Sequence, residues 1–356
     1  MKVLYVATPN SIGHHKSYFL GVSKAADDYV LVTERYCPDI NCKQYYDERL
    51  NFGTKSLKEY FKVINLIKKI CKEEKPDIIH IQCGDNFYRF FGLGLNTLGC
   101  RHIVMTFHHI GRSTLRDISM KCIYQKIAYG VVHTNFQIEM LGKMGIKNVF
   151  HIEYPVFNKP QIINSDDAKK FFGLSANIKT LAVIGSTRKD KGLDILLSSL
   201  KKIDRPFQLL IAGSEGEITE SCIDQLSSGY KEKVTKYIKY LDKTELTMAL
   251  NAADIIVLPY RKCFEGASGP LGEGCVMGKT IVGPDHGSLG DIIKKNHLGF
   301  TFEAENVESL SLCINKALNE SFVPDDNYIK YQVSLSEKFF VEKYGSFFKK
   351  VVTLYQ

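Results

Sequence analysis

Apolar, β-branched runs alternate with helix-period runs along this chain, and the alternation begins twice. Such alternation predicts parallel sheets with crossover helices, because parallel neighbours need a long connection between them. We therefore expect an α/β protein. In the first half, the strands are expected at residues 3–8, 29–34, 77–82, 102–108, 130–134 and 150–156.

A stretch without helical spacing separates the two halves. Residues 154–164 read YPVFNKPQIIN, with two prolines, which is typical of a linker. The chain of 356 residues has room for two domains of about 150 residues each. We expect two doubly wound, Rossmann-like domains facing across a cleft, with ligands outside the carboxyl ends of strands. The second set of strands is expected at residues 180–186, 208–214, 234–241, 254–260, 279–284 and 298–303.

Three helical segments are predicted from pattern. Residues 56–73 carry an apolar stripe with lysines opposite, which predicts a crossover helix, with a membrane-surface helix as the alternative. The run FGLGLNTLG around Gly92 lacks the third glycine of a dinucleotide fingerprint and predicts a helix of small residues. Residues 336–355 predict a helix whose aromatic side chains need a surface to cover, and packing back across the cleft is one option. These aromatic residues are Phe340, Tyr344, Phe347 and Phe348.

Cysteine usage and hydropathy indicate the compartment. The ten cysteines form no CxxC pair, so we expect reduced thiols and neither disulfides nor a zinc site. The run VLYVA after Met1-Lys2 is too short for a signal peptide, and no stretch of about 18 apolar residues occurs. We expect a cytoplasmic protein without a membrane span.

The net charge of +8 is unevenly distributed. Residues 1–158 hold 21 Lys and Arg against 14 Asp and Glu, whereas residues 159–356 hold 26 against 25. A basic first half suits an anionic membrane surface or an acidic acceptor. The alternative is an ordinary basic surface without a partner. We expect no nucleic-acid partner.

The segment GSTRKDKG at residues 185–192 lies between an apolar strand and an amphipathic helix. Backbone N–H groups and the helix dipole favour anions at such a position, and Arg188 and Lys191 add positive charge. We expect a phosphate to bind there. The alternative is an ordinary polar turn.

The segment EGASGPLGE at residues 265–273 holds two carboxylates eight positions apart around a Gly-Ser-Gly-Pro turn. One suits sugar hydroxyls and the other a ribose diol, unless Glu265 and Glu273 are solvated acids at a helix start. Cations for a diphosphate and carboxylates for two sugars describe a nucleotide sugar. The chain has no DxD triplet to hold a divalent ion. We therefore expect no metal cofactor, with the phosphate charge met by side-chain cations and backbone dipoles.

A set of motifs resembles the retaining glycosyltransferases of GT-B fold, family four, also called the group 1 type. In order, it reads KPDIIHI, TFHHI, GxxRxxKG, AADIIVLPYR, Ex7E and GKTIVGPDHGSLGDII. The resemblance implies metal-independent transfer of a sugar from a nucleotide donor with retained anomeric configuration. It also implies an acceptor-side domain at 1–158, a donor-binding domain at 159–335 and a C-terminal helix at 336–356 that crosses back to the first domain.

The resemblance assigns roles to named positions. Arg188 and Lys191 would neutralise charge on the leaving diphosphate, Glu265 would contact the donor sugar and Glu273 the ribose. His108 aligns with a histidine beside the donor sugar, although a histidine at a strand end is often only a satisfied polar residue. These four, Arg188, Lys191, Glu265 and His108, are the predicted catalytic residues. The predicted donor-binding residues are Gly13, Gly185, Ser268, Gly269, Pro270, Leu271 and Glu273.

Some positions depart from the family pattern. Many members have arginine directly after the first glycine, where this chain has Ser186, and EGASGP replaces the common EGFGLP. A family Gly-Gly loop is reduced to Gly13, for which a simple turn glycine is the alternative. His109 occupies a position often held by aspartate.

The predicted function is transfer of a sugar to a glycan or lipid-linked acceptor in polysaccharide biosynthesis. In lipid-acceptor relatives, a region comparable to Arg112–Ala128 docks on membrane, which suits a peripheral position at the inner face of the membrane. A core-facing helix is the alternative for that stretch. For the whole chain, the alternatives are a nucleotide-sugar epimerase of the same fold and a non-catalytic nucleotide-sugar-binding subunit.

Overall fold

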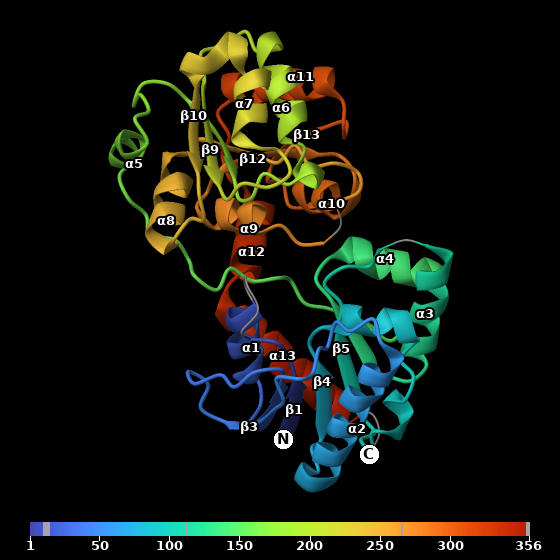
Figure 1. The fold of residues 1–356 in the computed structure, drawn as a ribbon. Helices are drawn as coiled ribbons and strands as arrows, with labels where there is room; N and C mark the ends of the chain where they lie inside the picture. Colours follow the sequence, from blue (N-terminus) through green and yellow to red (C-terminus); the bar gives the residue numbers. More distant parts are fainter. Residues whose placement is uncertain (10–14, 112, 265, 354–356) are drawn as a thin grey trace. The chain divides into compact units, whose positions relative to one another are not determined.

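The computed structural model describes residues 1–9, 15–111, 113–264 and 266–353. The chain divides into two compact units. Unit 1 comprises residues 1–157 and 336–356, and unit 2 comprises residues 158–335. The ribbon is shown in Figure 1. Residues 154–164, the predicted linker, hold no helix or strand.

Within its described residues, unit 1 is built on a seven-stranded sheet in the order β3-β2-β1-β4-β5-β6-β7. All of its strand pairings are parallel; for example, Val3 pairs with Ile78. The strands are β1 Lys2–Val6, β2 Asp28–Thr33, β3 Lys43–Tyr46, β4 Ile78–Ile81, β5 Ile103–Thr106, β6 Tyr129–Val132 and β7 Val149–His151.

Helices cover both faces of this sheet, as parallel strands require. One core contains side chains of α2, α3 and α4, and the other contains those of α1 and α13. Ser56 caps α2 by accepting a hydrogen bond from the backbone N–H of Glu59, so this predicted helix begins at a regular N-cap. The helices are α1 His15–Ser23, α2 Leu57–Glu74, α3 Thr114–Tyr124, α4 Asn135–Lys143 and α13 Glu337–Thr353, with short 3-10 helices η1 Gly84–Phe90 and η2 Leu95–Thr97.

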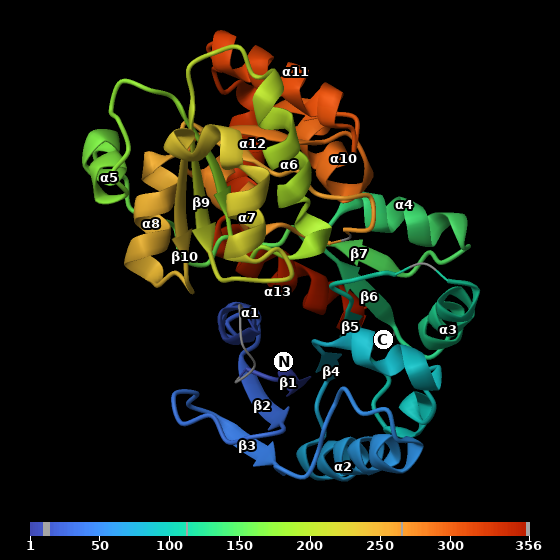
Figure 2. The ribbon, with the colours of Figure 1, turned by 45° about the horizontal axis from the view of Figure 1, so that its top comes forward.

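The C-terminal helix α13 belongs to unit 1. Its four aromatic side chains, Phe340, Tyr344, Phe347 and Phe348, are buried against strands and α1, as their pattern predicts. In Figures 1 and 2, α13 lies beside α1, although the two helices come from opposite ends of the chain.

Unit 2 carries a six-stranded parallel sheet in the order β10-β9-β8-β11-β12-β13, counted over the described part of the chain. From β8, the next two strands in the chain, β9 and β10, are added on one side of the sheet. Strands β11, β12 and β13 are then added on the other side, so the direction in which strands are added reverses between β8 and β11. The strands are β8 Thr180–Ile184, β9 Gln208–Gly213, β10 Val234–Ile238, β11 Ile255–Val257, β12 Thr280–Pro284 and β13 Gly299–Phe302.

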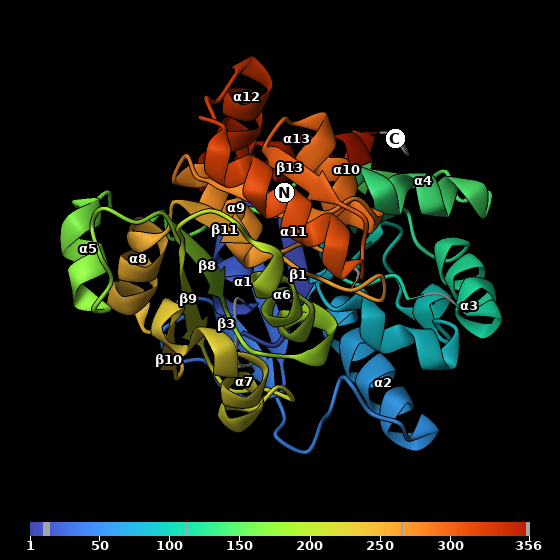
Figure 3. The same ribbon diagram turned by 90° about the horizontal axis from the view of Figure 1, so that it is seen from above.

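Helices also lie on both faces of the unit 2 sheet. Figure 3 shows α5 and α8 on one side of β8, β9 and β10, and α6 and α7 on the other. The helices are α5 Ser165–Phe171, α6 Leu193–Ser199, α7 Glu220–Leu226, α8 Lys243–Ala252, α9 Gly269–Val276, α10 Gly287–Lys295, α11 Val307–Asn319 and α12 Asp326–Ser334, with 3-10 helices η3 Lys189–Lys191, η4 Leu200–Lys202 and η5 Ser228–Lys233.

All twelve predicted strands are present, but two details of unit 1 differ from the prediction. The short edge strand β3, KQYY, was not predicted, because it contains no apolar run. The segment around Gly92 was predicted to be helical and instead forms turns and η2. Gly92 and Gly94 both have positive φ, at 59° and 85°, so the backbone there leaves the helical region.

Candidate functional site

The loop at residues 185–192 begins at the point where the strand order of unit 2 reverses. Strand β8, which is fully buried, ends at Ile184, and its neighbours in the sheet are β9 and β11. Ligands of open α/β sheets bind outside the carboxyl ends of the strands at such a reversal. Gly185 has φ of 111°, a backbone conformation that residues with a side chain rarely adopt.

Thr187 anchors this loop to the loop that follows β9. The Thr187 hydroxyl donates to the carbonyl oxygen of Ile218 at 2.6 Å and accepts from the N–H of Gly216 at 2.8 Å. Gly213 is equally confined, because a Cβ there would lie 2.1 Å from the carbonyl oxygen of Gly185. The phosphate loop predicted from sequence is therefore held rigidly on one side.

Arg261 braces the other side of the same loop. Its Nε donates to the Lys189 carbonyl oxygen at 2.9 Å, its Nη2 donates to Asp194 at 2.5 Å, and its backbone N–H donates to the Asp190 carbonyl oxygen. We did not identify Arg261 as a site residue from sequence, although it ends the quoted run AADIIVLPYR. Its role in the structure is to position the loop.

Lys191 is the half-buried cation of this loop. Among the described residues, no hydrogen bond or ion pair is made by its ammonium group, which lies 5.7 Å from the centre of the Tyr260 ring. Burial, and then the neighbouring charge of Arg188, lower the pKa of Lys191. A Cβ on Gly185 would lie 2.7 Å from the Lys191 Nζ, so glycine leaves room for the ammonium group.

Arg188 differs from Lys191 in being exposed and paired. Its Nε and Nη2 donate to the Asp190 carboxylate at 2.9 and 2.7 Å, and this pairing raises the pKa of Arg188. An exposed ion pair of this kind contributes little free energy, so the side chain is free to exchange partners.

The turn before α9 brings four more of the predicted residues to this loop. Ser268 caps α9, its Oγ accepting from the Leu271 N–H at 3.4 Å and donating to the Tyr260 hydroxyl at 3.4 Å. The Cγ of Pro270 lies 3.9 Å from the position of a Cβ on Gly185. Pro270 has no N–H, and the Leu271 N–H is used by the cap. In the described structure this leaves the N–H of Gly269 without a protein partner at the start of the helix.

Glu273 follows one turn later on α9 and is half-buried. Burial raises the pKa of Glu273 to about 7, and the charge of Lys191 opposes this rise. Within the described ranges, its carboxylate makes no hydrogen bond. Unit 2 thus holds an unpaired ammonium group and an unpaired carboxylate within electrostatic reach of each other, at the carboxyl edge of its sheet. Tyr260, whose pKa burial raises to about 12, lies between the two segments and was not predicted from sequence.

Two of the predicted site residues have no described position. Glu265 and Gly13 lie outside the described residues, so their predicted roles stay predictions.

His108 follows β5 in unit 1. Its Nε2 lies 3.1 Å from the Gln82 carbonyl oxygen, and its backbone N–H donates to the Asp85 carboxylate at 3.1 Å. Burial, followed by the charge of His133, holds the pKa of His108 well below its usual range, so the ring is neutral. Burial also raises the pKa of Asp85 to about 6. The Asp85 carboxylate, which was not predicted as a site residue, fixes the loop that carries His108.

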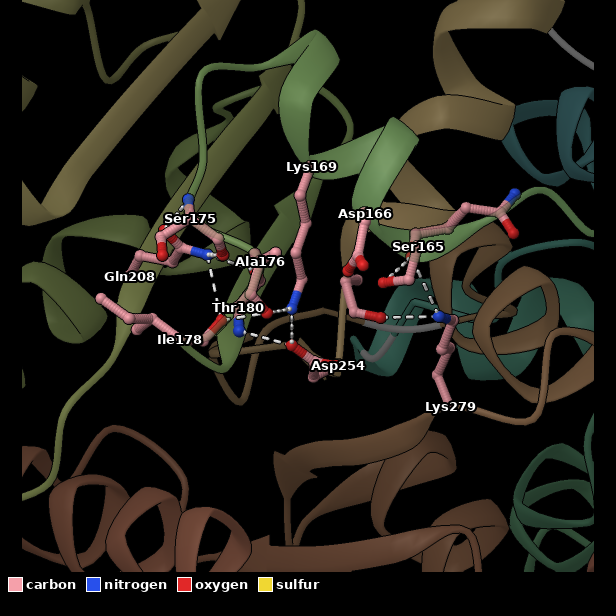
Figure 4. Close-up of polar contacts among 12 residues, drawn as sticks. Ser165, Asp166, Lys169, Ser175, Ala176, Ile178, Thr180, Gln208, Asp254 and Lys279 are labelled. Carbon is pink, nitrogen blue, oxygen red and sulfur yellow. Dashed lines mark hydrogen bonds and ion pairs between the residues drawn. The ribbon is translucent and has the colours of Figure 1, made fainter.

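At the amino ends of the unit 2 strands, the buried Lys169 and the half-buried Lys279 also have protein partners (Figure 4). Lys169 pairs with Asp254 at 2.9 Å and donates to the carbonyl oxygens of Ala176 and Ile178. Lys279 donates to two carbonyl oxygens, the closer at 2.6 Å. Both lysines lie at the amino ends of strands and donate to protein oxygens, and the three donors of Lys169 all have protein partners.

In the part of the chain that the structure describes, no group of three or more His, Cys, Asp or Glu side chains is arranged to hold a metal ion. Metal independence nevertheless stays a prediction. In the same residues, no helix combines the length and the apolar character needed to cross a bilayer.

Residues 164–334, which are nearly all of unit 2, match the family model described as glycosyl transferases group 1. A stretch of 142 residues is 25% identical to glycogen synthase of Mycobacterium tuberculosis (strain CDC 1551 / Oshkosh), covering 39% of this chain and 34% of that protein. The chain thus spans about a third of the length of this curated relative. The group 1 part of the resemblance is confirmed for residues 164–334, whereas retention of configuration and membership of family four stay predictions.

Solved structures share the architecture of the whole chain. Anabaena HepE in complex with UDP-glucose aligns with a TM-score of 0.75 at 12% identity, over 99% of both chains. The apo form of the lipopolysaccharide outer core galactosyltransferase WaaB aligns with a TM-score of 0.75 at 15% identity, over 100% of both chains. Sucrose-phosphate synthase from Thermosynechococcus elongatus aligns with a TM-score of 0.73 at 14% identity, over 99% of this chain and 100% of that one. These likenesses confirm the predicted GT-B fold.

Proposed function

We propose that this chain is a glycosyltransferase that moves a sugar from a nucleotide-sugar donor to a glycan or lipid-linked acceptor. We further propose that transfer retains the anomeric configuration and needs no divalent metal. Support comes from the group 1 match of residues 164–334 and from likeness in fold to proteins such as HepE, whose structure was solved with UDP-glucose.

The observation that carries this proposal is the unpaired ammonium group of Lys191 at the strand-order reversal of unit 2. A half-buried cation without an anionic partner is unfavourable unless a ligand supplies the missing charge. A diphosphate supplies it, and the Gly269 N–H adds a hydrogen-bond donor nearby. Arg188 reaches the same anion by leaving Asp190, at little cost because that pair is exposed.

Glu273 is the partner we propose for the ribose diol. A carboxylate accepts hydrogen bonds from two adjacent hydroxyl groups, and ionised Glu273 has no competing donor among the described residues. Glu265 is proposed to contact the donor sugar, on the strength of the sequence resemblance alone. His108 is proposed to accept a hydrogen bond from a substrate hydroxyl, since its neutral ring has an unprotonated nitrogen.

The chemical step we propose is a front-face displacement. The bond between the anomeric carbon and the phosphate oxygen breaks, and negative charge grows on the diphosphate, where Lys191 and Arg188 stabilise it. The acceptor oxygen bonds to the same face of the sugar, which passes through an oxocarbenium-like state. The acceptor proton moves to the departing phosphate oxygen. Because the acceptor oxygen itself attacks the anomeric carbon, no enzyme nucleophile is needed.

We also propose peripheral contact of α3 with an anionic membrane. Met120 and Ile123 of this helix are buried in unit 1, as a core-facing helix requires, but Leu115 and Ile118 are 65% and 50% exposed. Exposed apolar residues beside Lys121 suit a membrane interface. Liposome flotation tests this at low salt: the protein should float with anionic vesicles, and a Leu115→Gln/Ile118→Gln variant should not. Equal flotation of both proteins, or of neither, would contradict the proposed contact.

The activity is tested with wild-type protein and a panel of UDP, GDP, ADP and CMP sugars. Thermal shifts select the donor, and proton NMR of the product with glucan or lipid-linked acceptors reports the anomeric configuration. We expect transfer with retention, unchanged by EDTA. Isomerisation of donor alone would favour the epimerase, and donor binding without turnover on any acceptor would favour a binding subunit. Inversion, or loss of activity with EDTA, would contradict the proposed mechanism.

A further inference from the structure

Unit 1 contains a buried chain of hydrogen-bonding groups that starts in its sheet and ends in two helices. The Nε2 of His80 lies 2.9 Å from the Thr106 hydroxyl, which lies 3.2 Å from the hydroxyl of Tyr344. The Tyr344 hydroxyl in turn lies 2.6 Å from that of Tyr18. All four side chains are buried, with at most 3% exposure. The Tyr18–Tyr344 hydrogen bond joins α1 to α13 directly, and Thr106 and His80 connect Tyr344 to strands β5 and β4.

The ring of Tyr18 is enclosed by aromatic groups. It makes an edge contact with Phe340 of α13 at 5.4 Å between ring centres and stacks on Tyr154 at 5.7 Å. It also contacts His108 edge-on at 5.1 Å and His133 at 5.5 Å. Tyr18 is therefore held both at its hydroxyl and around its ring. It presents that fixed surface to His108.

The surroundings of His108 also determine which ring nitrogen carries the proton. A carbonyl oxygen only accepts hydrogen bonds, so the Nε2 beside the Gln82 carbonyl oxygen is the protonated nitrogen of the neutral ring. The Nδ1 is then an acceptor. The backbone on either side is fixed by Asp85, which accepts from the His108 N–H, and by Gln137, which donates to the His108 carbonyl oxygen at 3.2 Å. The His133 ring lies 5.0 Å away.

We propose that Tyr18, held by the hydroxyl of Tyr344, is a positioning residue that fixes the His108 ring with Nδ1 as a hydrogen-bond acceptor for a sugar hydroxyl. The identity of this ligand rests on the proposed function. The orientation and tautomer of His108 do not, because they follow from contacts within unit 1. The C-terminal helix thus contributes to the site through one hydroxyl group.

The charge state of His108 supports this role. The titratable groups that face it are Asp85, His133, Tyr18 and Tyr154, and His109 and His15 also influence it. Burial is the largest cause of its lowered pKa, so loosening the packing of Tyr18 should admit water and let the pKa rise. A protonated ring has no acceptor nitrogen and cannot take the proposed hydrogen bond.

The test uses NMR of the full protein labelled with 15N-histidine, which reports tautomer and protonation without substrate. In the wild type, we expect one neutral His108 tautomer with Nδ1 unprotonated, which is protonated only at a pH well below the usual pKa of histidine. Tyr18→Phe and Tyr344→Phe should each give mixed tautomers and a titration moved up by about one pH unit. Tyr60→Phe is the matched control, because Tyr60 is a buried tyrosine of unit 1 whose hydroxyl donates to the Leu93 carbonyl oxygen at 2.8 Å.

A second pair of variants, at Thr106, separates loss of a hydroxyl group from general disruption of the fold. Thr106→Ser keeps the central hydroxyl and should behave as wild type, whereas Thr106→Val should reproduce the effect of Tyr344→Phe. In transfer assays, the tyrosine variants should lose about tenfold in kcat, with the KM for donor nearly unchanged. The same single tautomer and titration in Tyr18→Phe, Tyr344→Phe and Tyr60→Phe would overturn the proposal. Absence of transfer by the wild type would instead overturn the proposed function, and the NMR result would still decide the role of Tyr18.

Discussion

At the amino edge of the unit 2 sheet, Lys169 and Lys279 are satisfied by protein groups, whereas at the carboxyl edge the Lys191 ammonium group has no such partner in the described structure. The first two reach carbonyl oxygens, and Lys169 also pairs with Asp254 (Figure 4). Lys191 faces a ring, an arginine and a carboxylate on another helix. The same residue type therefore stabilises the fold at one edge and is left available for an anion at the other. A lysine whose partners come from the protein has a structural role, and a lysine without a protein partner is a candidate for binding a ligand.

The comparison predicts its largest effect for Lys191→Ala. Removing a cation that stabilises the leaving diphosphate should lower kcat by about 10²–10³-fold. The free energy of unfolding should stay within about 0.5 kcal/mol of wild type, because no protein partner is lost. Initial rates of nucleoside diphosphate release measure the first quantity and urea unfolding the second. Lys189→Ala, on the same turn but exposed, is the control and should retain full activity.

The opposite result is expected for Lys169→Met. It removes the ion pair with Asp254 and the hydrogen bonds from Lys169 to two carbonyl oxygens, which should cost on the order of 2–3 kcal/mol in the free energy of unfolding. Transfer per folded molecule should not change. Urea unfolding of Lys169→Met beside Lys170→Met, an exposed neighbour on α5, separates the loss of the buried contacts from the loss of charge. A stable but inactive Lys169→Met would reverse the comparison between the two edges.

Much of the fold could be predicted from the sequence, because strands buried on both faces of a sheet appear in the sequence as apolar runs. Strands were predicted to extend too far at their carboxyl ends; for example, residues 102–108 were expected as one strand, but β5 ends at Thr106. Beyond it, the backbone N–H of His108 donates to the Asp85 carboxylate and not to a neighbouring strand. That side chain is 23 residues away in the sequence, so local pattern carries no sign of it.

The site could be predicted only in part. The sequence marks Arg188 and Lys191 equally, since both are basic residues of one loop. Only the structure shows that Asp190 pairs with Arg188, while Lys191 has no ion pair within the part of the chain that is described. Arg261 and Tyr260 were missed because their roles depend on the approach of β8 and β11, which a local pattern does not encode.

His133 provides a further comparison, because its Nε2 also has no partner among the described residues, yet the side chain is only 4% exposed. Burial lowers the pKa of His133 to about 4, below the value of about 6.5 in the unfolded chain. The unfolded state therefore binds more protons below pH 6.5, and stability present above that pH is lost as the pH falls toward 4. His133 should contribute about 2 kcal/mol of this loss at pH 5. His80 adds to the loss, and Asp85, whose pKa is raised, offsets part of it.

Urea unfolding of wild type and His133→Gln at pH 7 and pH 5 measures this contribution. The variant should lose about 2 kcal/mol less than wild type between the two pH values. An identical loss in both proteins would mean that protonation of His133 does not contribute to the loss of stability at low pH. The contrast between an enclosed unpartnered group, which affects stability, and the unpaired Lys191, which is proposed to bind a ligand, would then fail.

Glu273 should give the smallest effect, on nucleotide affinity. With its pKa raised to about 7, the carboxylate form needed to accept from a ribose diol is lost as the pH falls through 7. Affinity for the nucleoside diphosphate should therefore rise by about tenfold from pH 6 to pH 8. Glu273→Gln should bind more weakly and show little of this dependence, whereas Glu342→Gln, at an exposed position in unit 1, should match wild type. A wild-type affinity that falls over this range would count against the assigned role.

The central claim is that the unpaired Lys191 is the binding partner of a diphosphate. Isothermal titration of UDP, GDP and ADP into wild type, Lys191→Ala and Lys189→Ala tests it without requiring an acceptor. For the nucleotide that wild type binds most tightly, we predict a Kd about 30–100-fold weaker in Lys191→Ala, corresponding to about 2–3 kcal/mol, and unchanged in Lys189→Ala. Equal affinity in all three proteins would contradict the claim.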